Sequence, residues 1–145
     1  MKYLDALIIG AGFSGLYQLH CLRDKLKLNT LVVEEGKDIG GTWYWNTYPG
    51  ARCDSESFTY GFTFSAKIFK NWTWKERYPK QNVILKYLKY FSNELKLKKN
   101  IVFNEKVISA KYIEKNNLWK VQTNNKKKYY TKYLICAVGS LSSIN

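Results

Sequence analysis

Hydrophobic positions in the first third of the chain alternate between strand-like and helix-like spacing. Residues 4–9 form an apolar run that predicts a buried strand, residues 16–26 predict a helix, and residues 30–33 predict a second strand that runs into Glu34. A strand, a helix and a second strand in this order are typical of an α/β fold with a parallel sheet. The turn between the first strand and the helix carries Gly10, Gly12 and Gly15.

The rest of the chain predicts one more long helix and several strands. Apolar residues recur at helical spacing at Ile84, Leu88, Phe91 and Leu95, which predicts an amphipathic helix over residues 81–95 that covers one face of the sheet. Residues 102–113, 118–123 and 128–134 are rich in β-formers and flank asparagine pairs, which predicts a β-meander. Residues 133–138 predict a buried strand that ends at a glycine.

The glycine turn matches the fingerprint of a dinucleotide-binding site. Gly10 permits a tight turn, Gly12 lets the backbone approach a pyrophosphate, and Gly15 lets the helix pack closely on the strand. Amides of the first helical turn then face the phosphates. The fingerprint also needs an acid after the second strand to bind a ribose hydroxyl, and Glu34 stands there.

Residues 35–54 show neither helical nor strand periodicity and predict a long ordered loop. Long loops inside compact domains are usually functional, and this one contains two tryptophans and two tyrosines. Flat side chains with backbone donors suit a planar heteroaromatic ligand. The alternative is an aromatic lid packed purely as core, in which Asn46, Arg52 and Asp54 would be awkward to bury.

The length and net charge of the chain limit the possible domain count and binding partners. A chain of 145 residues is one domain's worth, and its formal net charge of +13 raises the question of nucleic acid. The excess is mostly scattered lysine, whereas arginine is preferred for phosphate and base readout, so we expect no nucleic-acid partner. The densest lysine cluster, residues 126–128, is interpreted as a solvated hairpin tip.

The cysteine and histidine content argues against disulfides and metals. Three cysteines without close pairing do not indicate a disulfide framework, and the single histidine, His20, suggests neither a metal site nor a histidine-based triad. No apolar run approaches the ~18 residues that a bilayer span needs. We therefore expect no metal, no membrane partner and a reducing, cytoplasmic location.

The aromatic loop makes a family resemblance specific. Residues 40–60 resemble the hallmark segment of the Baeyer–Villiger monooxygenases, within the class B flavin monooxygenases. The match continues through residues 71–74, the Arg77-Tyr78 pair, Gln81, residues 118–121 and residues 133–142, and so covers essentially the whole chain. The family usually has arginine where this chain has Thr47.

The resemblance implies an α/β fold, namely a Rossmann-like FAD-binding domain with a parallel sheet plus a β-meander. Residues 1–139 would form this domain, of the two-dinucleotide-binding flavoprotein type, and the strand at 133–138 would lie beside the first strand. Residues 140–145 would begin a linker to an NADPH-binding domain that the chain lacks. The resemblance therefore implies a truncated chain, a fragment or one piece of a split protein.

The resemblance also implies site residues. Asp54 would be catalytic, holding an arginine of the missing domain beside the flavin. Val107 would offer its backbone to the adenine, and the segment 52–54 would also face the nicotinamide of NADPH. The full implied cofactor-binding set is Gly10, Gly12, Phe13, Ser14, Gly15, Glu34, Gly41, Thr42, Trp43, Tyr44, Trp45, Arg52, Cys53, Asp54, Tyr60 and Val107.

The implied activity is that of an FAD- and NADPH-dependent monooxygenase that inserts oxygen from O2 next to a ketone carbonyl through a C4a-peroxyflavin. The chain alone is expected to be inactive, and a separate chain could supply the NADPH domain. Three alternatives stay open: a fragment of a related enzyme that oxygenates nitrogen or sulfur, a non-catalytic FAD-binding module, and, on charge alone, a nucleic-acid binder.

Overall fold

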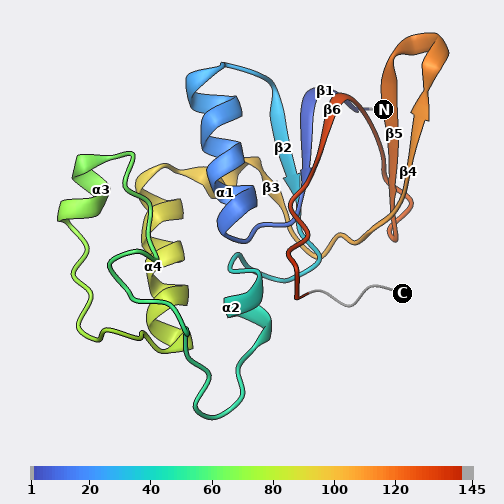
Figure 1. Cartoon of the computed structure of the whole chain (residues 1–145). Helices are drawn as coiled ribbons and strands as arrows, with labels where there is room; N and C mark the ends of the chain where they lie inside the picture. The colour runs from blue at the N-terminus through green and yellow to red at the C-terminus, as the bar shows by residue number, and fades with distance from the viewer. Residues whose placement is uncertain (1, 142–145) are drawn as a thin grey trace.

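A six-stranded sheet organises the described part of the chain, residues 2–141 of a computed structural model (Figure 1). The strand order is β3-β2-β1-β6-β5-β4. Neighbours from β3 to β6 are parallel, whereas β5 is antiparallel to both β6 and β4. The strands are β1 (Lys2–Ile9), β2 (Thr30–Val33), β3 (Ile101–Val102), β4 (Val107–Ile113), β5 (Leu118–Thr123) and β6 (Lys128–Cys136).

Helices gather on one side of this sheet, and the β4–β5 hairpin lies at the far edge (Figure 1). The α-helices are α1 (Phe13–His20), α2 (Thr42–Trp45), α3 (Ala66–Lys70) and α4 (Gln81–Glu94). Helix α1 continues as a π-helix, η1 (Cys21–Lys25), and two 3₁₀ turns, η2 (Leu97–Asn100) and η3 (Glu114–Asn116), precede β3 and β5.

Alternating side chains divide the core between the two faces of the sheet. On the helical face, Ile8 of β1 and Val32 of β2 pack with Leu16 of α1 and with the buried side of α4. On the opposite face, Leu7 and Leu31 pack with residues of the meander strands, including Val121 and Tyr129. The apolar run at residues 4–9 is therefore buried because both sides of β1 are covered.

Several predicted elements are confirmed with small shifts. β2 and β5 match their predictions, and α4 ends one residue early, with Ile84, Leu88 and Phe91 fully buried. The first helix was predicted too late, because it begins at Phe13, directly after Gly12. Its α-helical part also ends earlier than predicted, at His20, where the chain changes to the wider π-helical winding. The predicted loop 35–54 contains the single turn α2.

Two predictions about the later strands are wrong. Residues 102–113 are not one strand: the chain leaves β3 after Val102, and Asn104 takes a left-handed conformation (φ 56°) before β4 begins. Residues 128–134 and 133–138 are not two strands, because β6 runs unbroken to Cys136 and pairs with β5 along its first part and with β1. Nor is the segment 133–138 buried as predicted, since Tyr133 is 60% and Val138 53% exposed.

The predicted linker and the expected lack of a membrane span can be compared with the structure only in part. Most of the predicted linker, residues 142–145, lies outside the described residues. Among residues 2–141, none of the helices has the length and apolar character needed to cross a membrane.

Candidate dinucleotide site

The glycine turn joins β1 to α1 at the carboxyl end of the parallel strands. Gly10 has a φ of 101°, and a Cβ on it would lie 2.5 Å from the carbonyl oxygen of Ala137. A Cβ on Gly15 would lie 1.9 Å from the carbonyl oxygen of Gly10. The roles predicted for these two glycines, a tight turn and close packing of helix on strand, are therefore confirmed.

The N-terminus of α1 is open. Gly12, its N-cap, offers no capping side chain, and the first turn contains no acidic residue. Ser14 is exposed beside it. Amides at such a terminus lack helical partners, and together with the helix dipole they favour an anion.

Phe13 was predicted among the cofactor-binding residues, and the structure uses its ring differently. The ring packs against Tyr60 and Phe62, with centroids 5.0 and 5.3 Å away, and against the core beneath α4. Only the backbone of Phe13 therefore belongs to the turn.

Glu34 lies where the fingerprint requires an acid, and its carboxylate is already bound by the protein. Its Oε2 accepts a hydrogen bond from the amide of Ala11 (2.6 Å), and its Oε1 accepts one from the amide of Gly36 (2.7 Å). The side chain is buried, with 5% exposed. Each carboxylate oxygen can accept a second hydrogen bond, so the protein contacts leave acceptor capacity for a ribose hydroxyl.

The segment Gly40-Gly41 lies directly against the glycine turn. The amide of Gly40 donates to the carbonyl of Ala11 (3.0 Å). Gly41 has a φ of 54°, and a Cβ on it would lie 2.8 Å from Cα of Gly12. A Cβ on Gly12 would in turn lie 3.4 Å from Cα of Gly41, so the absence of side chains brings the two segments together.

The aromatic residues of α2 face in different directions. Trp43 is buried, and its Nε1 donates to the hydroxyl of Tyr60 (3.1 Å). The hydroxyl of Tyr44 accepts from the amide of Lys37 (3.2 Å), whereas Trp45 is 58% exposed. Thr42 begins the turn and is half-buried. The reading of the loop as purely buried core thus fails at Trp45.

Tyr60 lies close to three other predicted site residues, Trp43, Cys53 and Asp54. Burial is the main cause that raises the pKa of Tyr60, and the neighbouring Cys53 and Asp54 raise it further, against the hydrogen bond from Trp43. Cys53 is buried, whereas Asp54 is exposed. Of the residues predicted around the flavin, the structure brings Trp43, Cys53, Asp54 and Tyr60 together.

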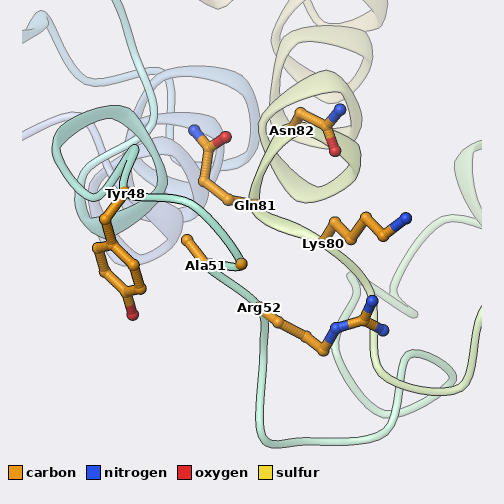
Figure 2. A pocket seen from close by; sticks show the side chains of 7 residues that line it. Tyr48, Ala51, Arg52, Lys80, Gln81 and Asn82 are labelled. Carbon is orange, nitrogen blue, oxygen red and sulfur yellow. The ribbon is translucent and has the colours of Figure 1, made fainter.

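Arg52 makes its hydrogen bonds to the segment that precedes α4. Its guanidinium donates to Glu76 (2.9 Å) and to the carbonyl oxygen of Tyr78 (2.6 Å). It lines a cavity of about 330 Å³ between the loop and the start of α4 (Figure 2). The other lining residues are Tyr48, Gly50, Ala51, Lys80, Gln81 and Asn82.

Val107 begins β4 and packs against the core cluster that contains Val33, the last residue of β2. The connection is short: the amide of Glu105 donates to the carbonyl oxygen of Glu34 (3.0 Å), two residues before Val107. The backbone that leads into Val107 therefore runs beside the backbone of Glu34.

The sequence did not predict several hydrogen bonds that hold the site together, most of them made by backbone groups. Ala11 and Gly36 hold the carboxylate of Glu34, and Gly40 joins the loop to the turn. Gln81 was noticed only as part of the resemblance, yet its side-chain amide donates to the carbonyl oxygen of Trp43. The glycines at positions 36 and 40 were the only features of the sequence that indicated these backbone contacts.

The family follows from comparison with known proteins. The model of the pyridine nucleotide-disulphide oxidoreductase family matches residues 7–145, and the chain belongs to this family.

Individual relatives are more specific. The chain is 42% identical over 141 residues to a Baeyer–Villiger monooxygenase of Pseudooceanicola batsensis, covering 97% of this chain and 26% of that protein. It is 39% identical over 142 residues to a phenazine N-monooxygenase of Lysobacter antibioticus, covering 98% and 26%. The crystal structure of cyclohexanone monooxygenase from Rhodococcus sp. Phi1 bound to NADP+ matches with a TM-score of 0.96 at 42% identity, covering 99% of this chain and 27% of that one.

These comparisons confirm the predicted resemblance to Baeyer–Villiger monooxygenases and the predicted α/β class. The chain spans about a quarter of the length of the curated relatives it matches.

Proposed function

We propose that the chain is the FAD-binding part of an NADPH-dependent flavoprotein monooxygenase that inserts oxygen next to a ketone carbonyl. The observation that carries the proposal is the open N-terminus of α1 beside the buried carboxylate of Glu34. Two of the three relatives described above, a Baeyer–Villiger and a cyclohexanone monooxygenase, favour a ketone as the substrate class.

The residues at the turn fit the adenosine half of FAD. Gly12 and Gly41 pack closely because neither carries a Cβ. The first turn of α1 contains no acidic residue and Ser14 is exposed beside it, so the amides of this turn would face an anion. The pyrophosphate would lie on these groups. Glu34 would accept hydrogen bonds from the ribose, and the backbone of Val107 would contact the adenine.

The aromatic loop would hold the flavin half. The segment 42–45 would line the ring system and the ribityl chain, with Tyr60 hydrogen-bonded to Trp43. The side chain of Asp54 is exposed, so it would be available to an arginine of another domain. The segment 52–54, with the cavity beside Arg52, would face the nicotinamide.

Bound FAD would supply the redox chemistry, since it can accept a hydride from NADPH and pass electrons to O2. The residues of this chain would bind and orient it and exclude water from one side through the buried Trp43. An NADPH-binding domain would come from further sequence or from a separate chain. The free cysteines Cys21, Cys53 and Cys136 support a reducing, cytoplasmic location.

The first experiment is a titration of the purified 145-residue chain with FAD, followed by flavin fluorescence. We expect saturable binding that Gly12→Val abolishes, because its side chain would enter both the pyrophosphate space and the contact with Gly41. Ser109→Val, at an exposed position on the edge strand β4, is the control. No saturable binding by the wild-type chain would refute the proposal.

The second experiment concerns turnover. We expect the chain alone to show no coupled NADPH oxidation and ester formation with cyclohexanone, because it spans only about a quarter of its relatives. Mixed with a separately produced C-terminal part of a relative, the wild type should form product. Asp54→Ala should form less with FAD still bound, whereas Ser55→Ala should match the wild type. Equal yields from the Asp54 variant and the wild type would remove Asp54 from the mechanism.

A further inference from the structure

Glu105 is a buried acid that the proposed FAD site leaves unexplained. Its side chain is 2% exposed, and its Oε1 accepts from the ammonium of Lys127 (2.5 Å) and from the side-chain Nδ2 of Asn125 (3.2 Å). Its Oε2 and the hydroxyl of Thr123 are both enclosed without a hydrogen bond of ordinary geometry. Burial raises the pKa of Glu105, but contacts with Lys127, Thr123 and Asn125 outweigh it, so the pKa is lowered and the carboxyl is charged at neutral pH.

The backbone on either side of Glu105 runs along the segment that carries Glu34. The amide of Glu105 donates to the carbonyl oxygen of Glu34 (3.0 Å), and the amide of Asn104 donates to the carbonyl oxygen of Gly36 (3.0 Å). Gly36 is the residue whose own amide holds Oε1 of Glu34. Residues 104–106 therefore support both the acid and one of its two backbone donors.

The turn between β5 and β6 holds residues 104–106 from the other side. The amide of Lys106 donates to the side-chain oxygen of Asn124 (3.0 Å), and the amide of Asn124 donates back to the carbonyl oxygen of Lys106 (2.9 Å). The side chain of Asn125 donates to the carbonyl oxygen of Asn104 (3.1 Å). The lysine-rich turn was interpreted as a solvated hairpin tip. This is incomplete, because Lys127 pairs with a buried carboxylate.

We propose that Glu105 is a positioning residue for Glu34. Its carboxylate, held by Lys127, fixes residues 104–106 between the hairpin turn and residues 34–36, and so sets the position at which Glu34 meets the adenosine end of the cofactor. The contact of Glu34 with a cofactor rests on the proposed FAD site. The hydrogen bonds from the amides of Ala11 and Gly36 to Glu34 exist without a ligand, so the effect of Glu105 on them can be measured in the ligand-free chain. The ion pair is enclosed on the Glu105 side only, because the side chain of Lys127 is 55% exposed.

The first test is amide hydrogen exchange of the full 145-residue chain, measured by NMR without ligand. In Glu105→Gln, which keeps the shape but loses the charge that Lys127 pairs with, the amides of Ala11 and Gly36 should exchange about tenfold faster. The amide of Leu88, in the core of α4, should change less. Lys126→Met, an exposed position on the same turn, is the control and should leave all three rates unchanged.

The second test is titration of the same variants with FAD and with ADP, which contains only the adenosine end. Glu105→Gln should weaken both by the same factor, about tenfold, and Lys126→Met should weaken neither. Uniform acceleration of all amides, or unchanged exchange at Ala11 and Gly36, would reduce Glu105 to a structural residue and overturn the proposal. If the wild type bound neither ligand, the FAD site would fail, while the exchange rates would still decide the role of Glu105.

Discussion

Replacing Glu34 with glutamine separates the hydrogen bonds that its carboxylate accepts from the protein from the ribose contact that we propose for it. In the ligand-free chain its carboxylate accepts one hydrogen bond from Ala11 and one from Gly36, and only 5% of the side chain is exposed. Glutamine has nearly the same shape but offers one acceptor oxygen and one NH2 group. One of the two amides would therefore face another donor inside the protein.

The expected loss of stability follows from these two contacts. Each amide-to-carboxylate hydrogen bond is charge-assisted and contributes roughly 1.5–3 kcal/mol, and a buried amide left without an acceptor costs about 1–3 kcal/mol. Glu34→Gln should therefore lower the free energy of unfolding by about 2–4 kcal/mol in the absence of FAD. For a chain of this size that corresponds to a Tm lowered by roughly 5–12 °C.

The assay is urea and thermal unfolding of the purified chain without flavin, compared with Glu35→Gln as a matched control. Glu35 is the adjacent acid, is exposed, and makes a surface ion pair with Lys106 (3.0 Å), so its replacement should cost less than about 1 kcal/mol. If the two variants unfolded at the same denaturant concentration, the carboxylate of Glu34 would not be holding the turn. A cofactor-only role would appear instead as a normal ligand-free stability with weakened FAD binding.

Three further predictions use other contacts. Gly41→Ala should weaken FAD binding at least about tenfold, because the new Cβ would collide with Gly12. The control is Gly50→Ala, which is also at positive φ but has open space around its Cβ, so it should cost only backbone strain of about 1–2 kcal/mol. Equal FAD titration curves for the two variants would refute the close contact between Gly41 and Gly12. Arg23→Lys should lower the free energy of unfolding by about 1–2 kcal/mol in a urea titration. The guanidinium of Arg23 donates to two carbonyl oxygens at the end of α4, and the single ammonium of lysine cannot reproduce this forked pair of hydrogen bonds. An unchanged urea midpoint would count against this prediction. Burial raises the pKa of Asp38, but hydrogen bonds from two lysines outweigh it and lower the pKa below 3.8. The stability advantage of the wild type over Asp38→Asn should therefore be present above pH 3.8 and be lost as the pH falls through the lowered pKa. A stability difference that does not change with pH would contradict this prediction.

Local chemistry in the sequence determined the first unit of the fold and the location of the candidate site. The run of apolar residues before Gly10, the spacing of the glycines and the acid after the second strand are each local patterns, and they predicted β1, α1, β2 and the place of Glu34. The predictions for α4 and β5 succeeded for the same reason, since helical or alternating periodicity is set within one element.

Tertiary structure alone decided which groups these residues meet. Glu34 finds its donors at Ala11 and Gly36, the ring of Phe13 turns into the core, and Arg52 pairs with Glu76, and none of these partners follows from spacing in the sequence. The same holds for the division between β3 and β4. There the side chain of Glu105 is buried against the distant hairpin while its amide pairs with the end of β2. Periodicity sets the face that a side chain occupies, whereas hydrogen bonds and ion pairs between distant segments depend on how the completed sheet brings those segments together.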